Sequence, residues 1–243
     1  MFGIPDAYHI GKVADVRWGR VLSEWEMSRA KKRKFSGIVK ELKVEYVVNS
    51  SEIPACVTEE LNVSAVQFLS VRVEKISAAS FVCEILQKLI KTLCVIRVYD
   101  DSNEAFSFAL KRLSKTDLEN IVVQEGFISG PFRSGSGCVE SQLVEKYCSW
   151  DTVVNRTNLY SWYVELMVKA YIMSHRGEWS RMEELLSSKV WFNTDDVLVL
   201  FAVLRELSQL TKERCNVVRI GDTVRVNGEL KKVFEMLGRC LYK

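Results

Sequence analysis

Few side chains in this sequence are of the types that perform chemistry, and they form no recognised catalytic pattern. The chain has two histidines, His9 and His175. A zinc site or a serine–histidine–aspartate triad needs histidine together with further ligands or a nucleophile. His9 lies near the start of the chain, and His175 is expected to end a helix. We interpret both as surface or capping histidines and predict no metal site and no cofactor.

Carboxylates offer a second kind of chemistry. A metal-dependent nuclease holds its divalent ion with clustered carboxylates and usually has a lysine nearby. Asp100 and Asp101 lie together in a predicted turn, but Ala109 stands two residues before Lys111, where such a site needs an acid. The pattern is incomplete, so we keep an atypical metal-dependent nuclease only as the alternative to a non-enzymatic role. It gains support if Asp100, Asp101, Glu104 and another acid converge in space.

Two further patterns lack something that the chemistry requires. Glu41 and Lys43 have the spacing of a nuclease pair, but we expect them to straddle the end of a helix. The glycine- and serine-rich stretch 130–137 follows a predicted strand, yet it lacks the lysine that completes a phosphate-binding loop. We interpret this stretch as a flexible connection.

One run of basic residues is the most concentrated charge in the chain. It comprises Arg29, Lys31, Lys32, Arg33 and Lys34. The run occupies the first two turns of a predicted helix, where the helix dipole disfavours positive charge. One interpretation is a solvated helix face. The functional one, which we carry forward, is contact with a nucleic-acid backbone or an acidic partner surface.

A group of tryptophans and tyrosines lies at helical spacing in the second half of the chain. Such rings can stack on bases, fill a core or anchor a partner surface. We weigh the core and the partner surface about equally and favour the surface. The candidate interface residues are Trp162, Tyr163, Tyr171, Trp179 and Trp191.

The elements that position the candidate residues are expected to be organised around a central β-hairpin. Residues 93–99 are almost wholly apolar and rich in β-branched side chains, which is typical of a strand buried on both faces. A polar corner at 100–103 leads to an alternating strand at 105–110. We expect five side chains of this hairpin to be nearly fully buried: Val95, Ile96, Val98, Phe106 and Phe108.

The remaining periodicity predicts an α+β fold. A central mixed or antiparallel sheet has flanking helices, and a helical C-terminal region follows. The stretch 126–137 suggests a boundary between a sheet domain, 1–137, and a mainly helical region, 138–243. The predicted strands are 43–48, 65–76 and 121–128, besides the hairpin. The predicted helices are 28–42, 78–91, 158–174, 180–187, 194–213 and 229–241, with short helical turns in 10–26.

Composition narrows the class of protein. The chain has 243 residues, 34 basic and 31 acidic side chains, and a formal net charge of +3, less basic than a nucleic-acid coat protein. Its seven cysteines include no CxxC pair, which indicates reduced thiols in the cytoplasm. No apolar run approaches the roughly 18 residues of a membrane helix. We expect no signal peptide.

Four stretches carry a resemblance to a known family. They are Met1–Pro5, the basic run followed by Val39–Tyr46, the strand–helix–strand–strand order from Val66 to Lys111, and the tail Val224–Lys232. In these the chain resembles a bacterial and archaeal family, the domain-of-unknown-function family 4391. None of the four stretches is a catalytic motif.

The resemblance implies a role rather than a reaction. Members of the family resemble small companions of helicases and DNA methyltransferases in restriction-like defence islands. We therefore expect a non-enzymatic accessory or scaffold subunit of an anti-phage defence complex. Its expected partner is a larger helicase, ATPase or methyltransferase, or a second copy of the chain, with nucleic acid as an additional candidate and no membrane.

Overall fold

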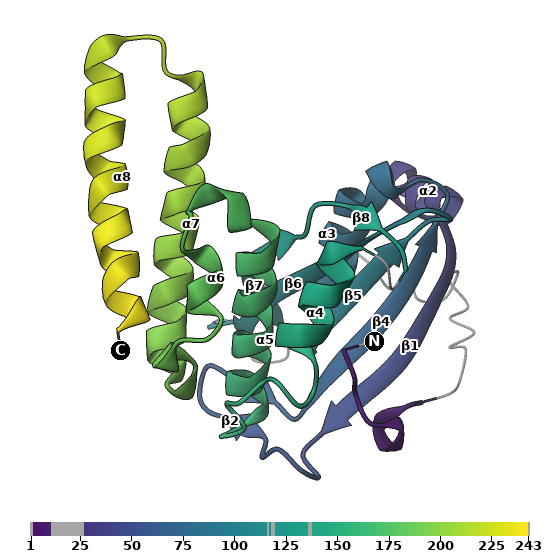
Figure 1. Ribbon diagram of the computed structural model, residues 1–243. Coiled ribbons are helices and arrows are strands. Elements are labelled where there is room, and N and C mark those ends of the chain that lie inside the picture. The colour runs from purple at the N-terminus through teal and green to yellow at the C-terminus, as the bar shows by residue number, and fades with distance from the viewer. Residues whose placement is uncertain (1, 11–26, 116, 118–119, 136–137, 243) are drawn as a thin grey trace.

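The computed structural model describes residues 2–10, 27–115, 117, 120–135 and 138–242. The predicted α+β class is confirmed, because helices flank a central mixed sheet and further helices end the chain (Figure 1). The short helical turns predicted within 10–26 fall, apart from Ile10, outside the described residues.

Six strands of the described part of the chain form one sheet in the order β1-β4-β5-β6-β7, with β8 also paired to β6. β4 and β5 are parallel, and a helix connects them, as a parallel crossover requires. The other neighbours are antiparallel. The strands are β1 (Val39–Asn49), β4 (Ala65–Val73), β5 (Leu93–Tyr99), β6 (Asn103–Leu113), β7 (Ile121–Ile128) and β8 (Phe132–Arg133), with a separate ribbon of β2 (Cys56–Val57) and β3 (Asn62–Val63).

Helices pack on both faces of the sheet and continue beyond it. The α-helices are α2 (Arg29–Ile38), α3 (Ala79–Leu89), α4 (Val139–Cys148), α5 (Leu159–Ser174), α6 (Met182–Leu185), α7 (Thr194–Asn216) and α8 (Ile220–Leu241). Short 3-10 turns are η1 (Asp6–Tyr8), η2 (Ile76–Ala78), η3 (Arg176–Glu178) and η4 (Lys189–Phe192).

The predicted central hairpin is confirmed as β5 and β6. Tyr99 pairs with Glu104, and the Asp100 carboxylate accepts the backbone N–H groups of Ser102 and Asn103 at 2.9 and 2.8 Å. This is the local bonding that makes aspartate a turn residue. The five predicted core side chains are all buried, at 8% exposure for Phe106 and 0% for the others.

One face of the sheet is covered by α2 and α3. The helix predicted over 28–42 ends at Ile38, because Val39 begins β1 and pairs with Val73 of β4. Leu42, the last residue of that predicted helix, is buried on a strand instead. The pairing of an eleven-residue strand with β4 outweighs the weak helical periodicity at this point.

The other face of the sheet is covered mainly by α4 and α5. Trp162 of α5 packs edge-on against Phe68, with ring centroids 6.1 Å apart, and Tyr163 packs on Phe108 at 6.2 Å. The Tyr163 hydroxyl accepts the backbone N–H of Ala109 at 2.9 Å. α5 is therefore the helix that joins the sheet to the helical region.

The hydrophobic cluster continues without a break from the sheet into α5, α7 and α8. The division into domains 1–137 and 138–243 stays a prediction, and it now describes two regions that share this cluster.

A buried ion pair in α5 holds the segment that precedes α5 and ties it to η4. Glu165 is 0% exposed and lies 2.5 Å from the Lys169 amine. Its carboxylate accepts the backbone N–H groups of Val154 and Asn155, and the Asn155 amide donates to a carbonyl of η4. Buried charges are tolerated when they are paired and hydrogen-bonded in this way.

α7 and α8 form an antiparallel hairpin whose distal half stands clear of the rest of the chain (Figure 1). α8 begins at Ile220, nine residues before the predicted start at Glu229. Val226 and Leu230 are buried, and the helix extends through Gly228 despite the low helix propensity of glycine. Packing on α7 supplies the stability that local sequence lacks.

Candidate functional site

The carboxylates of the nuclease hypothesis are engaged by other groups. The pKa of Asp100 is held below its ordinary value by backbone hydrogen bonds from Ser102, Asn103 and Ile76. Asp101 pairs with Arg72 at 2.8 Å, and the buried Glu104 pairs with Arg97 at 2.5 Å. Within the described ranges, no group of three or more histidine, cysteine, aspartate or glutamate side chains is placed to hold a metal ion. The geometry therefore adds nothing to the nuclease alternative.

Glu41 and Lys43 do not straddle a helix end. Both lie on β1 and pair with each other at 2.7 Å, which raises the pKa of Lys43. Their register partners on β4 are Arg72 and Ser70, so a cation stands opposite the glutamate. Ser70 in turn donates to Glu45. This part of the sheet is a salt-bridged polar surface.

Part of the glycine-rich stretch is a strand rather than a flexible connection. Phe132 and Arg133 form β8, which pairs with Asn103 and Glu104 at the start of β6. The pairing of β8 with β6 forms a strand that the glycine- and serine-rich composition does not predict.

The two histidines are surface and capping residues, as predicted. His9 is exposed and its ring meets Tyr46 edge-on at 5.2 Å. His175 caps the C-terminus of α5 and stacks on Tyr171 with ring centroids 4.0 Å apart. Its Nδ1 lies 2.9 Å from the Tyr171 carbonyl oxygen.

The basic run lies on the surface of α2. Arg29, Lys31, Arg33 and Lys34 are exposed and Lys32 is half-buried. The first turn contains no acidic residue to offset the helix dipole. This placement leaves the run accessible to a ligand, and its contact with nucleic acid or an acidic partner stays a prediction.

The predicted aromatic interface is wrong for most of its members. Trp162 and Tyr163 are at most 1% exposed, Trp191 is 2% exposed, and Tyr171 is 5% exposed. Only Trp179 among the five is half-buried; it stacks on Phe234 of α8. α5 is enclosed between the sheet and α7, so the same helical spacing that suits a partner surface serves the core.

The structure reveals an apolar surface that the sequence analysis missed. Val218, Ile220 and Val224 are 94%, 84% and 69% exposed at the distal end of the α7–α8 hairpin. We call these three side chains the hairpin tip. The run Val217–Ile220 lies between two amphipathic patterns without a turn residue. That pattern could have indicated an exposed connection between two helices.

Basic side chains surround the hairpin tip. Lys212, Arg214 and Arg219 have no ion-pair partner among the residues that the structure describes. Arg225, by contrast, pairs with Glu213 and Glu229. The exposed Asp222 offsets one of these charges, so the tip combines exposed aliphatic surface with a small excess of positive charge.

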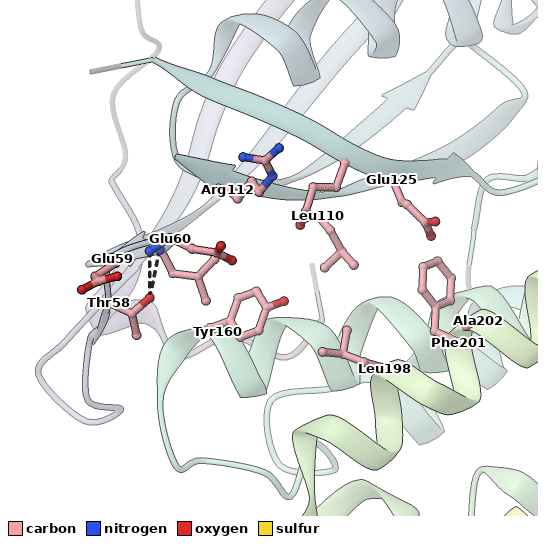
Figure 2. A pocket seen from close by; sticks show the side chains of 12 residues that line it. Thr58, Glu59, Glu60, Leu110, Arg112, Glu125, Tyr160, Leu198, Phe201 and Ala202 are labelled. Carbon is pink, nitrogen blue, oxygen red and sulfur yellow. Dashed lines mark hydrogen bonds between the residues drawn. The ribbon is translucent and has the colours of Figure 1, made fainter. Parts of the chain in front are cut away.

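A groove of about 730 Å³ lies at the base of the same hairpin. Figure 2 shows Leu198 and Phe201 of α7 and Tyr160 of α5 facing Leu110 of β6. Burial raises the pKa of the Tyr160 hydroxyl, with smaller contributions from Cys56 and Asp195. These side chains give the groove an apolar floor.

Acidic residues form one rim of this groove. Glu59 and Glu60 are exposed on the turn between β2 and β3, and neither has a salt-bridge partner in the described part of the chain. Arg112 also lines the groove and donates to the Leu113 carbonyl at 3.0 Å, so the two acids are opposed by one cation. The groove suits an apolar ligand that carries positive charge.

Together these features define an α+β scaffold that presents a projecting helical hairpin. The chain belongs to the family described as Domain of unknown function (DUF4391), whose model matches residues 2–237. No curated protein and no solved structure gives a significant match. In the described ranges, no helix combines the length and the apolar character needed to cross a membrane.

Proposed function

We propose that this protein is a non-enzymatic accessory subunit that assembles with other proteins through its α7–α8 hairpin. The observation that carries the proposal is the hairpin tip, where Val218, Ile220 and Val224 are more than two-thirds exposed. Exposed aliphatic groups gathered on a projecting element are typical of a protein-binding surface.

The energetics favour a covered tip. Full burial of one valine or isoleucine side chain contributes about 1.5–3 kcal/mol. The tip is held by two packed helices, so little conformational entropy is lost when a partner covers it. Three such side chains can therefore act as the anchor of an interface.

The partner that we propose is a helicase, ATPase or methyltransferase of a cytoplasmic anti-phage defence complex. This part of the proposal rests on the family resemblance. The basic run of α2 provides a second, electrostatic contact with an acidic patch of that partner or with nucleic acid. The paired carboxylates near Asp100 favour this role over a nuclease.

The test is isolation of the native assembly from the source organism. An affinity-tagged chain is expressed at its native level, and proteins that co-purify are identified by mass spectrometry. We expect a helicase, ATPase or methyltransferase with the wild type and its loss from the double variant Val218→Glu, Ile220→Glu. The matched control is Val139→Glu, which alters a 55%-exposed valine on α4. Retention of the same partner by the double variant would refute the assigned docking role.

A further inference from the structure

The hairpin tip and the groove lie at opposite ends of one helix. Leu198, Phe201 and Ala202 of α7 line the groove, and Arg214 lies near the distal end of the same helix. A two-fold axis perpendicular to α7 would therefore bring the tip of each copy to the base of the other. Such an isologous arrangement makes two equal contacts and closes at a dimer.

The chemistry of the two surfaces is complementary. The tip offers exposed aliphatic groups, and the groove offers an apolar floor formed by Leu110, Tyr160 and Leu198. Around the tip, the cations Lys212, Arg214 and Arg219 outnumber the exposed acid Asp222. At the groove, the acids Glu59 and Glu60 outnumber Arg112, because the third acid, Glu125, is paired with Arg205. Complementary charge at an interface rim sets the register and favours association.

The tip cannot occupy the groove of its own chain. α7 is one uninterrupted helix from Thr194 to Asn216. At about 1.5 Å per residue, Val218 lies roughly 25 Å from Phe201 along the helix axis. A tip that occupies the groove is therefore the tip of another molecule.

We propose that the partner at the hairpin tip is a second copy of this chain, with each tip inserted in the groove of the other copy. The inference rests on the proposed role of the hairpin as a docking element and names its immediate partner. The larger partner then binds this dimer through the exposed basic run of α2, so a tip variant that breaks the dimer also releases that partner.

The first test is the molar mass of the purified wild-type chain by light scattering over a range of concentrations. We expect a dimer. The double variant Val218→Glu, Ile220→Glu should raise the dimer dissociation constant by more than about 30-fold, as loss of an interface anchor does. Val139→Glu should leave the constant unchanged. Far-ultraviolet circular dichroism checks that each variant is folded.

A charge swap tests the rim. Glu60→Lys should weaken the dimer by about fivefold, in keeping with an exposed pair, and more strongly at low salt. Adding Arg219→Glu to the same chain should restore the wild-type constant, because both contacts then pair opposite charges again. No restoration would show that these two side chains do not meet.

Thiol cross-linking tests the register directly. Cys215 is exposed near the tip, and Ala202→Cys places a thiol at the groove. Both lie on α7 about 20 Å apart at 1.5 Å per residue, too far for a disulfide within one chain. Under mild oxidation we expect Ala202→Cys to form a covalent dimer that peptide mapping assigns to positions 202 and 215. The variant Ala202→Cys, Cys215→Ser should not form it.

The outcomes separate this inference from the proposed function. A monomeric wild-type chain, or cross-links only between identical positions, would overturn the inference. If the larger partner still required the tip in that case, the proposed function would stand. A dimer with the expected cross-link, together with a larger partner that ignores the tip variants, would support the inference and refute the docking role of the tip toward that partner.

Discussion

Phe108 is the side chain whose removal should most directly test the central role of the β5–β6 hairpin. It is 0% exposed and stacks on Phe127 of β7 with ring centroids 5.4 Å apart. It also packs on Tyr163 of α5 at 6.2 Å and meets Phe2 edge-on at 6.5 Å. The ring thus joins the sheet, α5 and the N-terminal segment.

The expected cost of Phe108→Ala is about 3–5 kcal/mol, the range for removing a buried phenylalanine. The upper half of this range is favoured, because aromatic pairs contribute about 0.5–1.5 kcal/mol beyond area burial. The total stability of a globular protein is only about 5–15 kcal/mol. The variant should therefore unfold at a clearly lower urea concentration.

Urea unfolding followed by circular dichroism measures the midpoint and slope of the transition. The matched control is Phe192→Ala, because Phe192 is 68% exposed in η4. Its free energy of unfolding should change by less than about 0.5 kcal/mol. An unchanged midpoint for Phe108→Ala would refute the assignment of the hairpin as the centre of the core.

Three further predictions concern surface charge, thiols and a buried amine. Replacing Lys31, Lys32 and Lys34 by glutamine should leave folding intact and weaken binding of the co-purified partner or nucleic acid, most clearly at low salt. Binding constants that fall with salt concentration at the same slope for wild type and variant would contradict this. All seven cysteines should be reduced, and a thiol reagent should label the exposed Cys215 first, because burial raises the pKa of the interior thiols, that of Cys83 to about 12. Rapid labelling of four or more cysteines in the native protein would contradict this prediction. Burial lowers the pKa of Lys111 from its ordinary 10.5, so at a pH between the two values the unfolded chain binds more protons than the folded chain, and the free energy of unfolding rises with pH in that range. Lys111→Met should remove this rise; urea unfolding that gives the same pH dependence for wild type and variant would refute the prediction.

The sequence by itself determined the central hairpin and the fold class. The apolar run of β5, the turn at Asp100 and the alternation of β6 are local patterns, and each specifies burial or chain reversal within a few residues. The capping role of His175 and the surface position of the basic run also follow from local spacing. The family resemblance extended this interpretation to most of the chain and is confirmed by the match over residues 2–237.

Only the tertiary structure decided the boundaries and roles that depend on distant partners. β1 begins at Val39 because β4 pairs with it, and α8 includes Gly228 because α7 packs beside it. Trp162 and Tyr163 have the same helical spacing in a core as in an interface, so spacing alone could not assign them.

The candidate docking surfaces depend on tertiary structure for the same reason. Val218 and Ile220 are ordinary aliphatic residues in sequence, and their exposure arises because the α7–α8 hairpin extends past the body that would cover them. The groove brings together Glu60, Leu110 and Leu198 from a turn, a strand and a helix that are far apart along the chain. Burial and proximity of this kind are properties of the packed chain, because they depend on which distant segments lie against each residue.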